Sequence, residues 1–211
     1  MTVARSLRFV APLASMAAIA LAALAPVAAR AQTLGTWSTA VPYGENDYAL
    51  GGFVLLGEPI GLVGHFRTGI AARTDIGIQV GFPDFDLYDY TLFGVAGDVK
   101  YLFFPETGEF PLDLAGDLAF GYQHAGDLDL IDFDFGPVAS KKVTTSGGKV
   151  LIPYSAVMFM VGNVEDDTEL DVQVRFGLDY PFAKGYELLT ELNLGSRDET
   201  ISFSAGVTAT F

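Results

Sequence analysis

TISFSAGVTATF, residues 200–211, ends the chain and decides the fold. Its even-numbered residues are all polar or glycine, while its odd-numbered residues are all apolar. Because successive side chains of a strand point to opposite faces of a sheet, strict alternation over this length predicts a β-strand with one apolar and one polar face.

The same period of two recurs along the chain and predicts an all-β fold. Five segments alternate clearly and four more weakly; none has helical spacing, and together with the C-terminal strand they give ten predicted strands. We therefore predict an antiparallel up-and-down barrel of ten strands, or of eight if the first two segments do not both span. The segments cover residues 47–56, 60–70, 75–82, 93–103, 112–123, 131–142, 149–161, 169–180 and 186–194.

Residues 1–31 have the pattern of a cleaved secretory signal peptide. A short basic region with Arg5 and Arg8 precedes an apolar stretch, and Ala29-Arg30-Ala31 supplies a cleavage site before Gln32. An apolar stretch of this length also suits a transmembrane helix, but two prolines and the cleavage site favour the signal. The predicted organisation is a signal peptide at 1–31, a periplasmic arm or plug at 32–46, and a barrel at 47–211.

Composition excludes several classes of protein. The residues that follow the signal carry nine basic and twenty-six acidic side chains, a net charge of −17, which argues against nucleic acid as a partner. The absence of cysteine excludes a disulfide framework and an N-terminal lipid anchor. No second apolar run is long enough for a helical membrane span.

The polar faces of the predicted strands indicate that they line a lumen. They carry small residues such as Gly94 and Ser204 and charges of both signs, whereas a solvated exterior favours long charged side chains. Aromatic residues lie near strand ends, as interfacial girdles require. These features favour a transmembrane barrel over a soluble barrel with an apolar interior.

The turns divide into two kinds along the sequence. Tight turns at 72–74 and 183–185, with a slightly longer one at 105–109, alternate with acidic segments at 83–89, 124–130, 164–168 and 196–199. We expect short turns on the periplasmic side, where both termini would lie, and longer loops on the other side.

The acidic segments raise the question of bound calcium. Oxygen ligands suit Ca²⁺, but the spacing is not that of an EF-hand, and solvated loops are the favoured interpretation, so no metal site is predicted. The residues are Asp84, Asp86 and Asp89, then Asp127, Asp129, Asp132 and Asp134, and finally Glu165, Asp166 and Asp167.

Short phrases of the sequence resemble a known group of proteins. The alternating segment that ends in Phe211 looks like the C-terminal signal read by the outer-membrane barrel assembly machinery. Residues 73–77, 98–101 and 153–154 are similar to phrases in small uncharacterised outer-membrane β-barrel proteins of Gram-negative bacteria. The resemblance implies the fold and an outer-membrane location, with lipid, lipopolysaccharide and the assembly machinery as partners. It implies no activity.

No catalytic residue or cofactor is predicted. His124 precedes Asp127 and Asp129, which suggests an omptin-like protease site, but the chain is too small for that family. For His65, a hydrogen bond inside the lumen is the favoured interpretation. No nucleophile elbow, phosphate-binding loop or metal cluster is present. The candidate lumen residues are His65, Arg67, Asp98, Lys100, Asp113, Asp117, Asp171, Arg175, Asp179, Glu187 and Glu191.

Three functions remain open at this point. The leading hypothesis is a structural or interaction barrel of the cell envelope whose lumen is largely filled, because small barrels hold side chains and little else. The second is a narrow, cation-preferring pore for small solutes, favoured by the excess of lumen carboxylates. The third is a soluble exported barrel that binds a ligand. The sequence indicates neither a substrate nor an oligomeric state.

Overall fold

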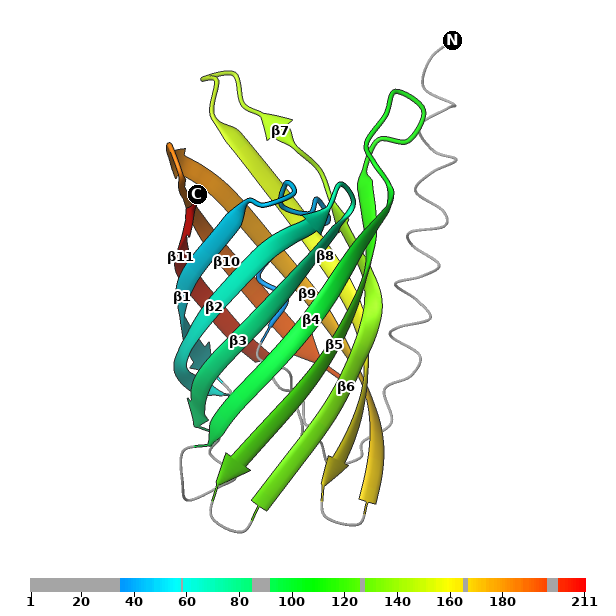
Figure 1. Ribbon diagram of the computed structural model, residues 1–211, viewed down its shortest axis with the longest axis vertical. Helices are drawn as coiled ribbons and strands as arrows, with labels where there is room; N and C mark the ends of the chain where they lie inside the picture. The colour runs from blue at the N-terminus through cyan, green and yellow to red at the C-terminus, as the bar shows by residue number, and fades with distance from the viewer. Residues whose placement is uncertain (1–34, 58, 85–91, 126–127, 165–166, 197–200) are drawn as a thin grey trace.

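The computed structural model describes residues 35–57, 59–84, 92–125, 128–164, 167–196 and 201–211 (Figure 1). Within these ranges all regular structure is β, and no helix is long and apolar enough to cross a membrane. The strands are β1 Tyr48–Gly57, β2 Ile60–Ala71, β3 Thr74–Asp84, β4 Phe93–Phe104, β5 Asp113–Ala125, β6 Leu128–Ser140, β7 Val143–Thr144, β8 Val150–Val164, β9 Asp167–Ala183, β10 Tyr186–Gly195 and β11 Ile201–Thr210.

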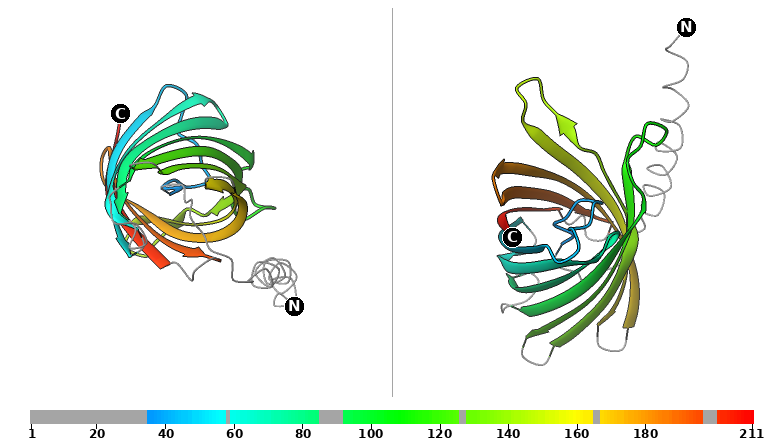
Figure 2. Two further views of the ribbon diagram at one scale, coloured as in Figure 1. Left: turned by 90° about the horizontal axis from the view of Figure 1, so that it is seen from below. Right: turned by 45° about the horizontal axis from the view of Figure 1, so that its top comes forward.

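Ten of these strands close into an up-and-down antiparallel barrel (Figure 2). Consecutive strands pair with one another, β1 pairs with β11, and β6 pairs with β8. The short β7 pairs only with β8 and stands outside the wall. The backbone groups of Tyr48 and Phe211 exchange hydrogen bonds of 3.2 and 2.9 Å, so both ends of the barrel chain lie at one rim. The predicted ten-stranded barrel is confirmed, and the eight-stranded alternative is wrong.

The alternation of the sequence becomes an outside and an inside. In β11, Phe203 and Val207 are exposed, whereas Ser204 and Thr208 point inward and are buried. The same holds around the barrel, where outward Leu, Ile, Val and Phe side chains are 36–62% exposed. A continuous apolar exterior of this kind suits contact with lipid.

Two of the acidic segments predicted as loops are shorter than expected. β5 continues to Ala125 and β6 begins at Leu128, while β8 continues to Val164 and β9 begins at Asp167. Asp132 and Asp134 are therefore lumen residues of β6, fully buried, and their assignment to a loop is wrong. They alternate with Ile131, Phe133 and Phe135 on the exterior, which is the strand period that the acidic composition obscured.

The predicted tight turns at 72–74 and 183–185 are confirmed, because two residues separate β2 from β3 and β9 from β10. The expectation that connections at the terminal rim are shorter than those at the opposite rim is wrong. Residues 105–112 and 141–149 are both long connections, and both lie at the rim that holds the termini (Figure 1). At the opposite rim, only two residues separate β5 from β6 and β8 from β9. The predicted loop residues 85–89, 126–127, 165–166 and 197–199 lie outside the described residues.

A charge on the exterior tests the orientation of the two faces. Val99, in the middle of β4, is 36% exposed, and Val143, on β7 at the rim, is 39% exposed. Replacing Val99 by Arg should lower the free energy of unfolding in lipid vesicles by about 2–4 kcal/mol, because charge is costly near the bilayer midplane. Val143→Arg should cost about 0–1 kcal/mol. Equal costs in urea titrations would contradict the assignment.

Candidate functional site

The chain enters its own barrel before it forms the wall. Residues 35–46 are here called the plug segment, and their first part, residues 35–40, is buried inside the ring of strands (Figure 2). Trp37 is 1% exposed, its ring stacks on Phe53 of β1 at 4.6 Å, and its indole Nε1 donates a 2.7 Å hydrogen bond to Ser204 Oγ of β11. The sequence left open whether residues 32–46 form a periplasmic arm or a plug. In the structure residues 35–40 lie in the lumen and residues 41–46 lead to the rim at the end of β2, while residues 32–34 lie outside the described residues.

Glu191 of β10 holds the start of the plug segment. Its carboxylate accepts hydrogen bonds from the backbone N–H groups of Thr36 at 3.3 Å and Trp37 at 3.1 Å. The Tyr154 hydroxyl of β8 donates to the same carboxylate at 2.9 Å. Trp37 has a φ of +37°, a left-handed conformation that a non-glycine residue keeps only where its surroundings hold it. Glu191 is fully buried, so these donors replace the water it loses.

Lumen side chains from four further strands bind the plug segment. Lys100 Nζ donates to Ser38 Oγ and, at 2.6 Å, to the Thr39 carbonyl. Arg175 donates to Thr36 Oγ1 at 2.7 Å. Two more hydrogen bonds join Gln79 Nε2 to the Gly35 carbonyl at 2.8 Å and the Ala40 N–H to Ser140 Oγ at 3.1 Å. The segment thus contacts strands on opposite sides of the barrel.

Tyr43 fixes the other end of the plug segment. Its backbone N–H donates to Asp75 Oδ2 and its hydroxyl donates to Glu187 Oε2, both at 3.1 Å. Burial, together with the negative charge of Glu187, raises the pKa of Tyr43 well above its usual range. The hydroxyl therefore stays protonated and remains a donor to the carboxylate.

Three cations pair with carboxylates inside the barrel. Arg67 binds Asp98 and, through Nε at 3.0 Å, Asp75. Lys100 Nζ lies 3.4 Å from Asp75 Oδ2, and Arg175 lies 3.6 Å from Asp134 Oδ2. All of these side chains are at most 5% exposed. Removing one member of such a pair would leave a buried uncompensated charge, which costs about 3–5 kcal/mol.

The lumen nevertheless carries more carboxylates than these cations can pair. Within the described residues, both carboxylate oxygens of Asp132 lack a hydrogen-bond partner, as does one oxygen each of Asp117, Asp171 and Asp179. These four side chains are at most 6% exposed. The electrostatic balance of the interior is therefore acidic.

The predicted lumen residues all point into the barrel. Asp113 lies nearest the terminal rim and accepts a 2.7 Å hydrogen bond from the Glu106 N–H. His65 is 2% exposed but forms no hydrogen bond with the described residues, so the predicted lumen hydrogen bond is wrong. Its ring lies instead 6.4 Å from Trp37 and 6.0 Å from Phe53.

Several contact residues were missed at the sequence level. Asp75, Gln79 and Tyr154 bind the plug segment or its partners, yet none was among the candidate lumen residues. An apolar cluster was also missed. It lies on inward faces expected to be polar, and it comprises Trp37, Phe53, Leu55, Val63 and Leu189. The one sequence feature that could have indicated this cluster is the presence of apolar residues on both faces of β1.

The His124–Asp129 pair lies on the exterior rather than in a cleft. His124 Nδ1 and Asp129 Oδ1 are 2.8 Å apart across the β5–β6 ladder, with side chains 48% and 60% exposed. The Tyr122 hydroxyl donates to the same carboxylate at 2.7 Å. Among the described residues, no group of three or more His, Asp or Glu could hold a metal ion.

Comparisons with known proteins give structural likeness only. Neither a protein-family model nor a curated protein matches the chain. Among solved structures, the β-domain of the Bordetella autotransporter BrkA gives a TM-score of 0.48 at 13% identity, covering 78% of this chain and 98% of that one. The KdgM porin gives 0.43 at 8% identity, covering 77% and 99%.

A bacterial polysaccharide outer-membrane secretin gives a TM-score of 0.48 at 13% identity, and the match covers 72% of this chain but only 57% of that one. The class of this protein follows from its own geometry. It is a closed β-barrel, apolar outside and charged inside, that encloses residues 35–40.

Neutralising Glu191 tests how the plug segment is held. Glu191→Gln should lower the free energy of unfolding by about 1.5–3 kcal/mol, because charge-assisted hydrogen bonds to Thr36, Trp37 and Tyr154 are weakened. It should also make Trp37, the only tryptophan, easier for acrylamide to quench in the folded protein. Asp129→Asn, at an exposed carboxylate, is the control. Matching urea midpoints and quenching in both variants would contradict this role.

Proposed function

We propose that the protein is an outer-membrane β-barrel with a structural or interaction role in the cell envelope, and that the plug segment keeps its lumen closed. The observation that carries the proposal is the anchoring of Thr36 and Trp37 to Glu191 within the barrel. A closed lumen offers no path for solutes, so the function falls to the surfaces at the two rims and on the exterior.

The apolar exterior and the closed ladder support an outer-membrane location. In hydrocarbon each unpaired backbone group costs several kcal/mol, and a barrel without edges avoids that cost. The predicted signal peptide accounts for export, with outer-membrane lipid and lipopolysaccharide as surroundings. Phe211 is 76% exposed at the end of β11, where its ring is available to an assembly factor. We propose it as the residue read by the barrel assembly machinery.

The narrow barrel and the side chains inside it support a closed lumen. A ten-stranded barrel is narrow compared with the wider barrels that form open water channels. Trp37 packs with Phe53 of β1 and Leu189 of β10 against the inner face of the wall formed by β1, β11 and β10. A second apolar cluster packs Ala40 of the plug segment near Met158 and Met160 of β8. We propose that the protein has no enzymatic activity.

The second candidate is a narrow, cation-preferring pore, and one observation favours it. Asp117, Asp132 and Asp179 carry carboxylate oxygens without hydrogen-bond partners among the described residues. Carboxylates that line a water-filled passage select cations. The plug segment decides between the candidates, because its removal would convert the filled lumen into an acidic one.

Planar-bilayer recording of refolded protein tests closure. The chain from residue 32 to 211 should give conductance near baseline, because the plug segment fills the lumen. A variant that begins at residue 47 should give small cation-selective steps, because the lumen carboxylates then face water. Full-length Glu191→Gln, which keeps every segment, should open intermittently.

The controls separate folding from closure. A heat-dependent shift on a gel and protection in vesicles show whether each variant has inserted. Steady cation-selective steps from the intact chain would favour the pore. Failure of the intact chain to insert into vesicles would favour the soluble exported barrel.

A further inference from the structure

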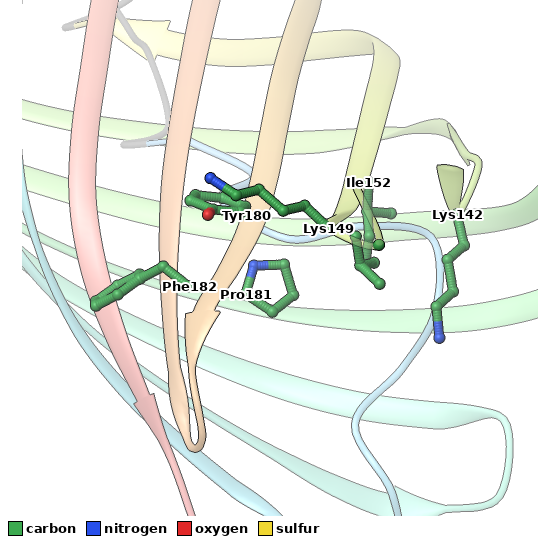
Figure 3. Close-up of a pocket in the computed structure, with 8 residues that line it drawn as sticks. Lys142, Lys149, Ile152, Tyr180, Pro181 and Phe182 are labelled. Atoms are coloured by element: carbon green, nitrogen blue, oxygen red, sulfur yellow. The ribbon is translucent and has the colours of Figure 1, made fainter. Parts of the chain in front are cut away.

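A pocket opens at the terminal rim, where two neighbouring strands separate. The ladder between β8 and β9 ends at the pair Ile152–Asp179, yet β9 continues to Ala183. The first residues of β8, before Ile152, pair with β7 instead and form a short hairpin with it. A pocket of about 500 Å³ lies between the hairpin and the end of β9 (Figure 3). The residues used below are Lys142, Lys149, Ile152, Tyr180, Pro181 and Phe182.

The pocket holds positive charge that the protein leaves uncompensated. Lys142 and Lys149 are exposed, and within the described residues neither forms an ion pair. The neighbouring Lys141, by contrast, lies 3.7 Å from Glu106 and donates to the Pro111 carbonyl. Acidic residues outnumber basic ones more than twofold in this chain. The two lysines therefore give the pocket a local positive charge in an acidic protein.

The same pocket is continuous with the apolar exterior. Figure 3 shows Lys149 extended across to Tyr180, and its Nζ lies 5.9 Å from the centre of that ring. Phe182 is 48% exposed and its ring lies 6.3 Å from that of Tyr186, which is 50% exposed. Aromatic rings at this position are typical of the belt at a membrane interface. A ligand that fits both surfaces combines an anionic group with apolar chains.

The end of β9 forms one side of the pocket. From Tyr180 onward β9 has a ladder partner only on the β10 side, so its edge toward the hairpin is open. Pro181 has no backbone N–H, which suits a strand edge without a ladder partner. The pocket between this edge and the two lysines is large enough for a phosphate group.

We propose that this pocket binds an anionic phospholipid, with its phosphate between Lys142 and Lys149 and its acyl chains against Phe182 and Tyr186. The proposal rests on the proposed membrane location and places the lipid in the leaflet nearest the termini. Charge complementarity carries the choice of occupant, because basic side chains at an interface attract anionic headgroups. Lysine binds phosphate as a point charge, without the planar geometry that arginine demands.

Native mass spectrometry of the refolded chain in detergent tests the proposal. The ligands are phosphatidylglycerol and phosphatidylcholine with identical acyl chains. The double variant Lys142→Gln/Lys149→Gln should bind phosphatidylglycerol about 25-fold more weakly, because each interfacial lysine contributes about fivefold in affinity. Phosphatidylcholine binding should be weak throughout.

A matched control removes the same charge from the same rim. Arg73→Gln/Lys184→Gln changes two exposed residues in the β2–β3 and β9–β10 turns, outside the pocket. This variant should keep nearly all phosphatidylglycerol binding. Equal losses in both double variants would overturn the pocket and leave only a diffuse charge effect.

Two further results separate the alternatives. Inorganic phosphate that displaced the lipid at comparable concentration would overturn the lipid assignment, because a free phosphate needs no apolar surface. Phe182→Ser should weaken phosphatidylglycerol without affecting phosphate. If the chain inserts into vesicles but the double lysine variant binds phosphatidylglycerol normally, the lipid-binding proposal fails while the proposed function stands. If the intact chain does not insert, the proposed function fails as well.

Discussion

In the outer-membrane location proposed above, the sheet must satisfy every backbone N–H and C=O from inside the protein, and the rest of this structure depends on that constraint. The ladders β1–β11 and β6–β8 meet it by closing the ring. Closure then turns one face of all ten strands toward a narrow common interior. The side chains there must neutralise and hydrogen-bond one another, because little water can share the space.

The lumen solves this problem by combining ion pairs with the plug segment. Arg67 and Lys100 share Asp75, so β2, β3 and β4 are joined through one carboxylate. Buried ion pairs contribute little net stability on their own, but breaking one is costly. The plug segment supplies backbone donors to Glu191 and acceptors to Lys100 that the wall alone does not provide. The wall and the plug segment therefore depend on one another.

Local pattern predicted the wall well. The alternation in residues 200–211 identifies β11 and its outward face, and similar patterns placed nine more strands within a few residues of their ends. The ends of the acidic strands were harder to predict. The acidic composition around Asp132 and Asp134 is typical of loops, although both side chains lie in the lumen. In β1, Phe53 and Leu55 point inward to meet Trp37, so the assumption of a polar interior failed there.

The position of the plug segment could not be predicted from local pattern. The hydrogen bond between Trp37 and Glu191 joins residues 154 positions apart, and nothing near Trp37 in the sequence specifies its partner. The pocket at the terminal rim has the same character. The pocket exists because β9 continues past the last residue that pairs with β8. The position of that last pair is set by the strand register of the whole barrel. Both features come from long-range pairing.

Site-directed crosslinking tests most directly whether the plug segment occupies the lumen. The chain has no cysteine, and the Ala40 N–H lies 3.1 Å from Ser140 Oγ. The pair Ala40→Cys/Ser140→Cys should therefore crosslink with a short bifunctional reagent in protein assembled in membranes. Ala40→Cys/Asp129→Cys, with its second thiol exposed on the exterior, should not. Failure of the first pair to crosslink, with Cys at position 40 labelled by a bulky maleimide as fast as Cys at position 129, would contradict a plugged barrel.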